Sequence, residues 1–270
     1  MRILGEYLIN LFRIVFAERY LISVMTKSAV ADQYVGSFLG FLWNFINPLA
    51  RIFIFWLVFS LGFKVQPKND VPFVVWLTAG MAAWFVFSEI ISSTSSAIVS
   101  NSHLIKKVLF PVQILPIVQI IACLVSHLVF MLILLGLIGL MGMPVNYYFL
   151  QFFYYLFCLS ILVLGLSFLV SALNVFIRDV GQGVGVILQI GFWATPVFWD
   201  IGMMPQKIQA ILKLNPMFYI VQGYRDSFIY FVPFWSRPDE MMVFWGMTLI
   251  LLLTGIAVFM KLQPQFADVL

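Results

Sequence analysis

The sequence predicts an all-α integral membrane protein with six transmembrane helices, and three observations lead to this fold class. Of the 270 residues, 63% are hydrophobic and 10% are charged, and the mean hydropathy is +1.05. Soluble domains carry roughly a quarter charged residues, so this composition argues against a water-soluble fold. The stretch 108–177 contains no Asp, Glu, Lys or Arg and is long enough for two helical crossings. Further apolar runs of crossing length occur on both sides of it.

Six apolar runs define the expected spans, since a helical crossing takes about 20 largely apolar residues. We expect a transmembrane domain over 34–270, preceded by a separate N-terminal segment, 1–33. The spans are placed near residues 36–62, 72–99, 111–141, 149–175, 182–199 and 241–260.

The N-terminal segment is expected to contain an amphipathic helix that lies in the membrane interface. Residues 5–27 place apolar side chains at helical spacing and interleave them with charged ones, a pattern typical of interfacial helices. The alternative is an ordinary start to the first span. Charges are scattered through residues 1–20 and no small-residue cleavage site is visible, so we expect no signal peptide here.

The region 200–240 is apolar but is interrupted by several charges and by prolines, among them Pro205, Pro216 and Pro233. We expect short re-entrant helices here, packed at the outer mouth between the fifth and sixth spans without crossing. Irregular backbone is tolerated at membrane depth only where protein covers it or where it lines a cavity.

Motifs of catalytic and nucleotide-hydrolysing sites are absent from the sequence. The chain has no Gly-Lys pair and therefore no GxxxxGK[ST] loop, so it cannot hydrolyse ATP by itself. HExxH and GxSxG are also absent. We expect no catalytic residue, no metal site and no cofactor on this chain. The glycine series 179–186 follows no strand pattern, and close helix packing through Gly181 and Gly185 explains it better than a nucleotide loop.

The cysteines and the intramembrane histidine are interpreted as packing residues. Cys123 and Cys158 lie inside apolar runs, without a CxxC pair or a neighbouring histidine. His127 lies within a span without an acidic neighbour in the sequence, so packing is a better interpretation than proton relay.

Five stretches, however, occur in an order and spacing that match a known family. They are YVGSFLGFLWNFINPLARIFIFWLVFSLGF (34–63), HLIKKVLFPVQILPI (103–117), NVFIRDVGQ (174–182), LQIGFWATPVFW (188–199) and LNPMFYIVQGYRDSF (214–228). Together they resemble the membrane subunit of ABC-type polysaccharide exporters, whose cargoes include O-antigen, capsule and teichoic acid. The pieces KLNPMFYIVQGYRDSFI (213–229) and QPQFADVL (263–270) look closest to wall teichoic acid translocation permeases.

This resemblance implies an ATP-driven exporter of the ABC-2 type, which moves a polymer linked to undecaprenyl diphosphate across the bacterial plasma membrane. It implies two copies of this chain with two separate ATPase subunits, and those subunits would bind ATP and Mg²⁺. It also implies cytoplasmic termini. Charge alone does not fix that orientation, because the basic residues divide eight against six between the two faces. No nucleic acid partner is expected, since a net charge of +4 is ordinary for a membrane protein with basic loops.

The resemblance makes the short segment 101–110 a coupling helix that binds the ATPase subunit. Asn101 or Ser102 would cap it. The alternative is a loop whose lysines only anchor it to lipid headgroups, which explains the lysines but not the apolar residues beside them. The coupling candidates in and after this helix are His103, Leu104, Ile105, Lys106, Lys107, Leu109, Phe110 and Pro111. The interfacial helix adds Phe12, Arg13, Phe16 and Arg19, and the turn between spans four and five adds Arg178 and Asp179, for which interface anchoring is the alternative.

A conduit for a sugar polymer needs surfaces that slide past many sugars without holding them. Aromatic faces give contact area without a fixed hydrogen-bond register. Aromatic residues make up 17% of the chain, and many of them must belong to the usual interfacial belt. The aromatic conduit candidates are Trp43, Trp84, Phe87, Trp193 and Phe198.

Charged residues at membrane depth are the other candidates for contact with the cargo. Arg51 lies in the first span and Glu89 in the second, and such charges usually pair or face water. Either they pair with each other, or Arg51 faces phosphates of the cargo. Tyr224 and Arg225 are candidates in the outer region, because the forked donors of arginine suit a phosphate. The alternative for Arg225, which we prefer, is that it ties the short helices together.

Other functional classes fit less well. A secondary transporter would show internal repeats with paired broken helices, and a channel would show rings of polar residues; the sequence shows neither. An integral-membrane enzyme acting on lipid-linked sugars would need an acidic or histidine cluster at one interface, whereas Asp179, Asp200 and Asp226 are scattered over both. Among exporters, O-antigen or another lipid-linked polysaccharide is the alternative cargo.

Overall fold

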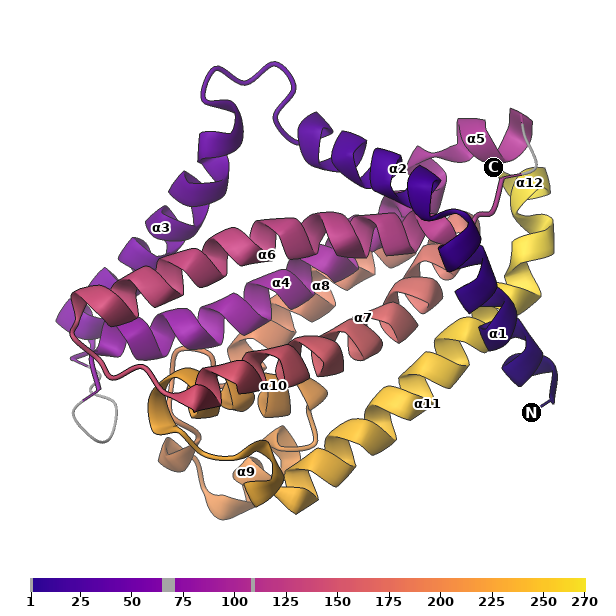
Figure 1. The fold of residues 1–270 in the computed structure, drawn as a ribbon. Coiled ribbons are helices and arrows are strands. Elements are labelled where there is room, and N and C mark those ends of the chain that lie inside the picture. Colours follow the sequence, from indigo (N-terminus) through magenta and orange to yellow (C-terminus); the bar gives the residue numbers. More distant parts are fainter. Residues whose placement is uncertain (1, 65–70, 108–109) are drawn as a thin grey trace.

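The computed structural model describes residues 2–64, 71–107 and 110–270, which form helices joined by short connections (Figure 1). No strand occurs in these ranges, so the all-α prediction is confirmed. Four long helices form the body of the molecule: α4 (Phe73–Ser100), α6 (Ile114–Leu140), α7 (Gln151–Phe176) and α11 (Pro238–Leu262). They are apolar around most of their circumference, as expected for helices surrounded by protein and lipid.

Helix α4 lies at the centre of the bundle. It contacts α3 (Trp43–Trp56), α6, α7, α8 (Asp179–Ala194) and α10 (Pro216–Arg225). In the most apolar 18-residue stretch of the segment Phe73–Lys106, 78% of the residues are buried. In the corresponding stretch of the first span, Gly40–Gly62, 6% are buried. Small residues on α4, such as Gly80 and Ala83, let neighbouring helices approach closely.

Five helical segments among the described residues are long and apolar enough to cross a membrane. They are Gly40–Gly62, Phe73–Lys106, Ile114–Leu140, Tyr147–Phe176 and Pro238–Val269, and they correspond to the expected spans one to four and six. The expected fifth span falls on α8, which has 16 residues. At 1.5 Å per residue it reaches about 24 Å, less than the roughly 30 Å of the hydrocarbon core. Six full spans therefore remain a prediction.

Helix α8 ends at Ala194, although the apolar run continues to Trp199. The residue before a proline is disfavoured in helical geometry, and Thr195 precedes Pro196. Thr195 accordingly has φ −88° and ψ 135°, and the chain continues as turns and bends. The helix thus ends five residues before the expected end of the fifth span at 199, and the limits of that span stay a prediction. Gly185, which was expected to allow close helix packing, has open space beside it within the chain. A close contact of α8 is made instead by Gly191, which packs against the Trp84 ring.

The first span packs far less tightly than the others. Helix α3 is preceded by a 3₁₀ turn (Gly40–Leu42) and followed by a π-helical turn (Leu57–Gly62), and it contains Pro48. Figure 1 shows it leaning away from the bundle, with α2 forming the other arm of a V. Most of its apolar side chains are exposed, so lipid or another polypeptide must cover them.

The N-terminal segment forms two helices where the sequence predicted one over 5–27. Helix α1 (Arg2–Ala17) and helix α2 (Arg19–Asp32) are separated at Glu18, whose φ −93° and ψ 17° depart from helical values. The two helices therefore run in different directions (Figure 1). Ile22 of α2 is buried against Ile114 and Val118 of α6, so α2 is attached to the bundle as well as amphipathic.

The two ends of the bundle differ in structure. Helices α1, α5 (Ser102–Lys107) and α12 (Phe266–Val269) lie at one end, which we call the terminal end (Figure 1). There the Tyr7 hydroxyl donates a hydrogen bond of 3.2 Å to Gln263 Oε1. The opposite end, which we call the distal end, consists of short elements: Ile201–Met203, α9 (Gln206–Leu212), α10, the π turn Asp226–Tyr230 and Phe234–Ser236.

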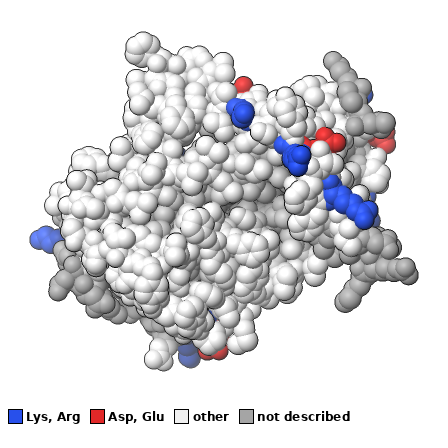
Figure 2. Space-filling model, viewed as in Figure 1, with Lys and Arg blue, Asp and Glu red and all other residues white. Residues whose placement is uncertain are grey.

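Charged side chains gather toward the edges of the molecule in Figure 2, chiefly at the terminal end. The broad middle of this face carries neither Lys, Arg, Asp nor Glu. An uncharged belt between charged ends is the surface that a bilayer requires, because a charge in the hydrocarbon core is costly.

Two glycines allow α7 and α11 to touch. A Cβ atom on Gly165 of α7 would lie 2.6 Å from the Leu252 Cα of α11, and one on Gly255 would collide with the Gly165 backbone. Both obstacles are backbone atoms, which cannot turn aside. Gly246, on the same helix α11, has open space around the corresponding position.

We predict that Gly255→Ala destabilises the protein by about 1–3 kcal/mol, the usual effect of overpacking. Gly246→Ala is the matched control and should leave stability unchanged or slightly raised, since alanine favours a helix more than glycine does. Thermal unfolding followed by tryptophan fluorescence in detergent would test this. Equal melting temperatures for the two variants would contradict the α7–α11 contact.

Candidate functional site

The first candidate surface is the exposed face of α5 at the terminal end. His103 and Lys106 are exposed there, whereas Leu104 and Ile105 are half-buried. Ile105 packs into the apolar cluster that contains Phe266 of α12. The apolar side of α5 thus rests at least partly on the bundle, and the face left for a partner is polar and basic.

The other coupling candidates lie around α5. Asn101 caps α4, not α5, since its Nδ2 donates to the Ala97 carbonyl at 2.8 Å. Phe176, just before the α7–α8 turn, packs on Phe266 with ring centroids 6.1 Å apart, which places that turn at the terminal end. Exposed candidates at this end are Phe12, Arg13, Phe16, Arg19, Arg178 and Asp179, and half-buried ones are Phe110 and Pro111. Leu109 and the side chain of Lys107 lie outside the described residues.

Four of the aromatic conduit candidates meet in one cluster between α3, α4 and α8. Trp84 and Phe87 have ring centroids 5.4 Å apart, and Trp193 and Phe198 are 4.8 Å apart. Trp84 and Phe198 are each only 4% exposed, whereas Trp193 is 56% exposed. Only Trp193 of these therefore presents a large free surface to a passing ligand. The sequence reasoning missed the rings that link the two pairs, namely Phe55, Phe59, Phe85 and Phe192.

A cavity of about 310 Å³ lies between the end of α2, α3, α4 and α6, and we call it the α3–α6 cavity. It brings together the candidates Trp43, Arg51 and Glu89. No ion pair within 4.0 Å joins Arg51 to Glu89 among the described contacts, and Arg51 Cζ lies 4.9 Å from the centroid of the Phe85 ring. Sequence reasoning missed the polar residues that share this cavity: Gln33, Tyr34, Asn44, Asn47, Ser126 and His127.

At the distal end Arg225 acts as a clamp, in line with the structural alternative. Its Nη1 and Nη2 donate to the carbonyls of Pro196 and Val197 at 2.8 and 2.6 Å, and its Cζ lies 3.5 Å from the centroid of the Trp76 ring. It is 2% exposed. Tyr224 is fully buried, and its hydroxyl shares a hydrogen bond of 3.0 Å with His127 Nε2. Neither side chain has a free face for a long polymer.

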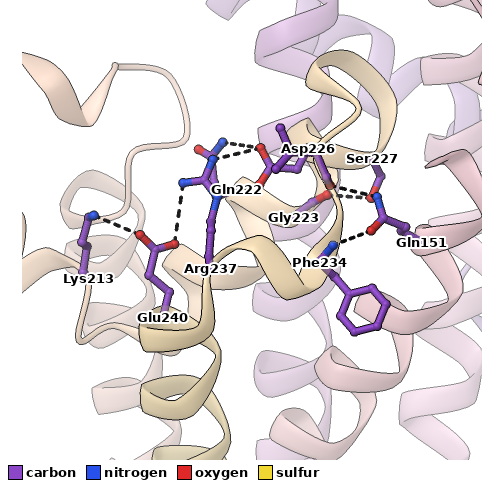
Figure 3. Close-up of polar contacts among 10 residues, drawn as sticks. Gln151, Lys213, Gln222, Gly223, Asp226, Ser227, Phe234, Arg237 and Glu240 are labelled. Carbon is purple, nitrogen blue, oxygen red and sulfur yellow. Dashed lines mark hydrogen bonds and ion pairs between the residues drawn. The ribbon is translucent and has the colours of Figure 1, made fainter.

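A chain of ion pairs joins α9, α10 and α11 beside this clamp (Figure 3). Lys213 Nζ lies 2.9 Å from Glu240, Arg237 lies 3.8 Å from the same carboxylate, and Arg237 Nε lies 3.0 Å from Asp226. Gln222 donates to Asp226 at 2.9 Å. Burial raises the pKa of Asp226, and the adjacent Arg237 acts in the opposite direction. Arg237 thus partly offsets the cost of burying this carboxylate.

Comparison with known proteins now identifies the family. The family described as ABC-2 type transporter matches residues 20–229, from α2 to the π turn after α10. The chain belongs to this family. The matched range includes α5, the α3–α6 cavity and Arg225.

Curated relatives cover between 70% and 97% of the chain. The O-antigen export system permease protein RfbA of Myxococcus xanthus is 27% identical over 264 residues, which are 97% of this chain and 99% of that protein. The protein of the same name from Klebsiella pneumoniae is 26% identical over 262 residues, 93% and 95% of the two chains. The polysialic acid transport protein KpsM of Escherichia coli is 25% identical over 195 residues, 70% and 73% of the two chains.

We predict that Arg237→Gln destabilises the distal end, because it leaves the Asp226 carboxylate, 2% exposed, without its cation. An unpartnered buried polar group costs about 1–3 kcal/mol and a charged one more. Lys207→Gln on the exposed side of α9 is the matched control and should have no effect. Hydrogen exchange of residues 213–240, compared with exchange of α7, would measure the loss. Unchanged protection in Arg237→Gln would contradict a structural role for the ion-pair chain.

Proposed function

We propose that this chain is the membrane subunit of an ATP-driven exporter of lipid-linked polysaccharide in the bacterial plasma membrane. The observation that carries the proposal is the match to ABC-2 type transporters over residues 20–229. The absence of a phosphate-binding loop from the sequence assigns ATP and Mg²⁺ to a separate ATPase subunit. The exposed basic face of α5 is the surface that we assign to that subunit, which places the terminal end, with both termini, in the cytoplasm.

The proposed cargo is wall teichoic acid linked to undecaprenyl diphosphate. It rests on the likeness of the stretches 213–229 and 263–270 to teichoic acid translocation permeases. The names of the curated relatives favour a second candidate, O-antigen or another lipid-linked polysaccharide. Expression in cells depleted of their own teichoic acid exporter, or of their O-antigen exporter, separates the two. Rescue of only the second strain would overturn the teichoic acid assignment.

The proposed conduit forms between two copies of this chain, with the exposed apolar side of α3 and the aromatic cluster at the contact. Trp193 supplies its most exposed ring. ATP binding would close the two ATPase subunits and shift both α5 helices, and the movement would pass to α4, which directly precedes α5 in the chain. Repeated cycles would move the polymer outward.

We predict that Lys106→Glu/Lys107→Glu strongly weakens binding of the proposed ATPase subunit. Reversing two charges at an interface turns attraction into repulsion worth several kcal/mol, so the co-purified ATPase should fall at least about tenfold. Lys207→Glu, at the distal end, is the matched control and should bind normally. Co-purification in mild detergent is the measurement. Full binding by the double variant would remove α5 from the interface, and no binding by the unaltered chain would overturn the proposed complex.

We also predict that Trp193→Ala lowers export about two- to tenfold, because one aromatic contact contributes about 0.5–1.5 kcal/mol. Trp235→Ala is the control, since Trp235 is similarly exposed (63%) but lies in the distal loops away from the aromatic cluster. Polymer reaching the cell surface is measured at equal protein levels. Equal export by both variants would remove Trp193 from the conduit.

A further inference from the structure

The α3–α6 cavity contains polar atoms whose bonding is incomplete. Asn44 Nδ2, Ser126 Oγ and His127 Nδ1 are buried without a hydrogen-bond partner among the described residues, and all three side chains line this one cavity. His127 is 3% exposed, and its other nitrogen is occupied by Tyr224. Buried polar atoms in native proteins are almost always satisfied, so their gathering here indicates a bound polar group.

The two charges of the cavity are also unsatisfied. Arg51 and Glu89 are both accessible, and the described contacts include neither a hydrogen bond nor an ion pair for either side chain. Arg51 Cζ lies over the face of the Phe85 ring, 4.9 Å from its centroid. A charge within a membrane protein needs a partner or water. The cavity therefore offers one unpaired cation and one unpaired anion within the same space.

This pair of charges selects among ligand classes. A simple anion would meet Arg51 but would be repelled by Glu89, and a simple cation would face the reverse problem. A neutral sugar would leave both charges without a counter-charge. A zwitterion meets both. With about 30 Å³ for each water-sized group, the volume of about 310 Å³ admits a phosphate, an amine and their linking carbons.

The nature of the positive group follows from the lining. Glu89, Ser126 and His127 Nδ1 can all accept hydrogen bonds, which a primary ammonium can donate three times. A quaternary ammonium donates none and is instead bound by open aromatic faces. The lining also contains Tyr34, Trp43 and Phe130, so the three hydrogen-bond acceptors, and not a lack of aromatic rings, favour an ethanolamine group over a choline group.

The outer faces of the two flanking helices indicate where the rest of such a ligand would lie. On α6, Leu128, Leu132 and Leu135 are 55%, 61% and 41% exposed and form an apolar stripe on the side turned away from the cavity lining. On α3, Leu49 and Phe53 are 48% and 58% exposed and likewise lie on the side opposite to Arg51. Both helices thus present apolar outer faces to acyl chains, while the headgroup enters the cavity between them.

We propose that the α3–α6 cavity binds the headgroup of a phospholipid of the ethanolamine type. The phosphate lies at Arg51 with Asn44 as a second donor, and the ammonium lies at Glu89 with Ser126 and His127. The bound lipid ties the loosely packed α3 to α4 and α6. This site is independent of the exporter's cargo and does not rest on the proposed function.

Native mass spectrometry of the delipidated full chain in detergent tests the site. We expect phosphatidylethanolamine to remain bound at concentrations where phosphatidylglycerol and phosphatidylcholine dissociate. Arg51→Gln should weaken binding of phosphatidylethanolamine at least about tenfold, because it removes a charge-assisted hydrogen bond to phosphate. Arg51→Lys keeps the charge and should retain most of the binding.

Glu89→Gln gives an outcome that misfolding cannot imitate. It removes the partner of the ammonium and the repulsion of anions, so phosphatidylglycerol should now bind as well as or better than phosphatidylethanolamine. The matched controls are Lys27→Gln and Asp32→Asn, which neutralise exposed charges of α2 outside the cavity lining and should preserve the original preference.

Three results would overturn the proposal. These are equal retention of phosphatidylethanolamine and phosphatidylglycerol by the unaltered chain, unchanged selectivity in Glu89→Gln, and a soluble glycerophosphoethanolamine that binds as tightly as the lipid. The last result would assign the site to a free zwitterion, because the apolar stripe would then contribute nothing.

Discussion

One buried guanidinium holds the distal end of this protein together. Where α8 stops before Pro196, the carbonyls of residues 196 and 197 lie outside any helix, and a hydrocarbon environment offers them no donor. Arg225 donates to both and lies against the face of Trp76 on α4. A lone buried cation would be unstable, but this one is satisfied by oxygen acceptors and an aromatic face. The irregular segment that follows α8 is thus held against α10 by Arg225.

Packing falls off from the centre of the bundle toward its first span. Helix α4 is enclosed by five neighbours, whereas α3 is held mainly by an aromatic cluster on one side and by the walls of a polar cavity on the other. Segments with few buried apolar contacts open at low free energy. Among the long described helices of the bundle, α3 is therefore the one that is held least firmly, and the proposed lipid in the α3–α6 cavity would strengthen its attachment.

The apolar runs predicted the places and order of the five helical segments that are long enough to cross a membrane, because a bilayer crossing demands a run of a definite length. They did not predict the end of α8 or the break at Glu18, since both depend on backbone geometry that composition does not report. The satisfied polar contacts were also missed. Gln151 of α7 accepts a bond from the Phe234 amide at 2.6 Å and donates to the Val232 carbonyl at 3.0 Å. Such partners are far apart in the sequence, and no local pattern marks them. Arg51 and Glu89 stood out because charges are rare in spans, while His127 was set aside because its neighbours come from other helices.

The position of α4 connects the two ends of the molecule in physical terms. Its 28 residues extend about 42 Å, so it is a rigid rod of roughly membrane thickness. Its terminal end continues through Asn101 into α5, and its distal half carries Trp76 against Arg225 and Trp84 against Gly191 of α8. Close-packed interiors have low compressibility and transmit displacements instead of absorbing them. In the proposed mechanism, a displacement of α5 would pass through this one helix to the Arg225 clamp and the aromatic cluster. Helix α3, which packs less tightly, would then take a new position beside α4.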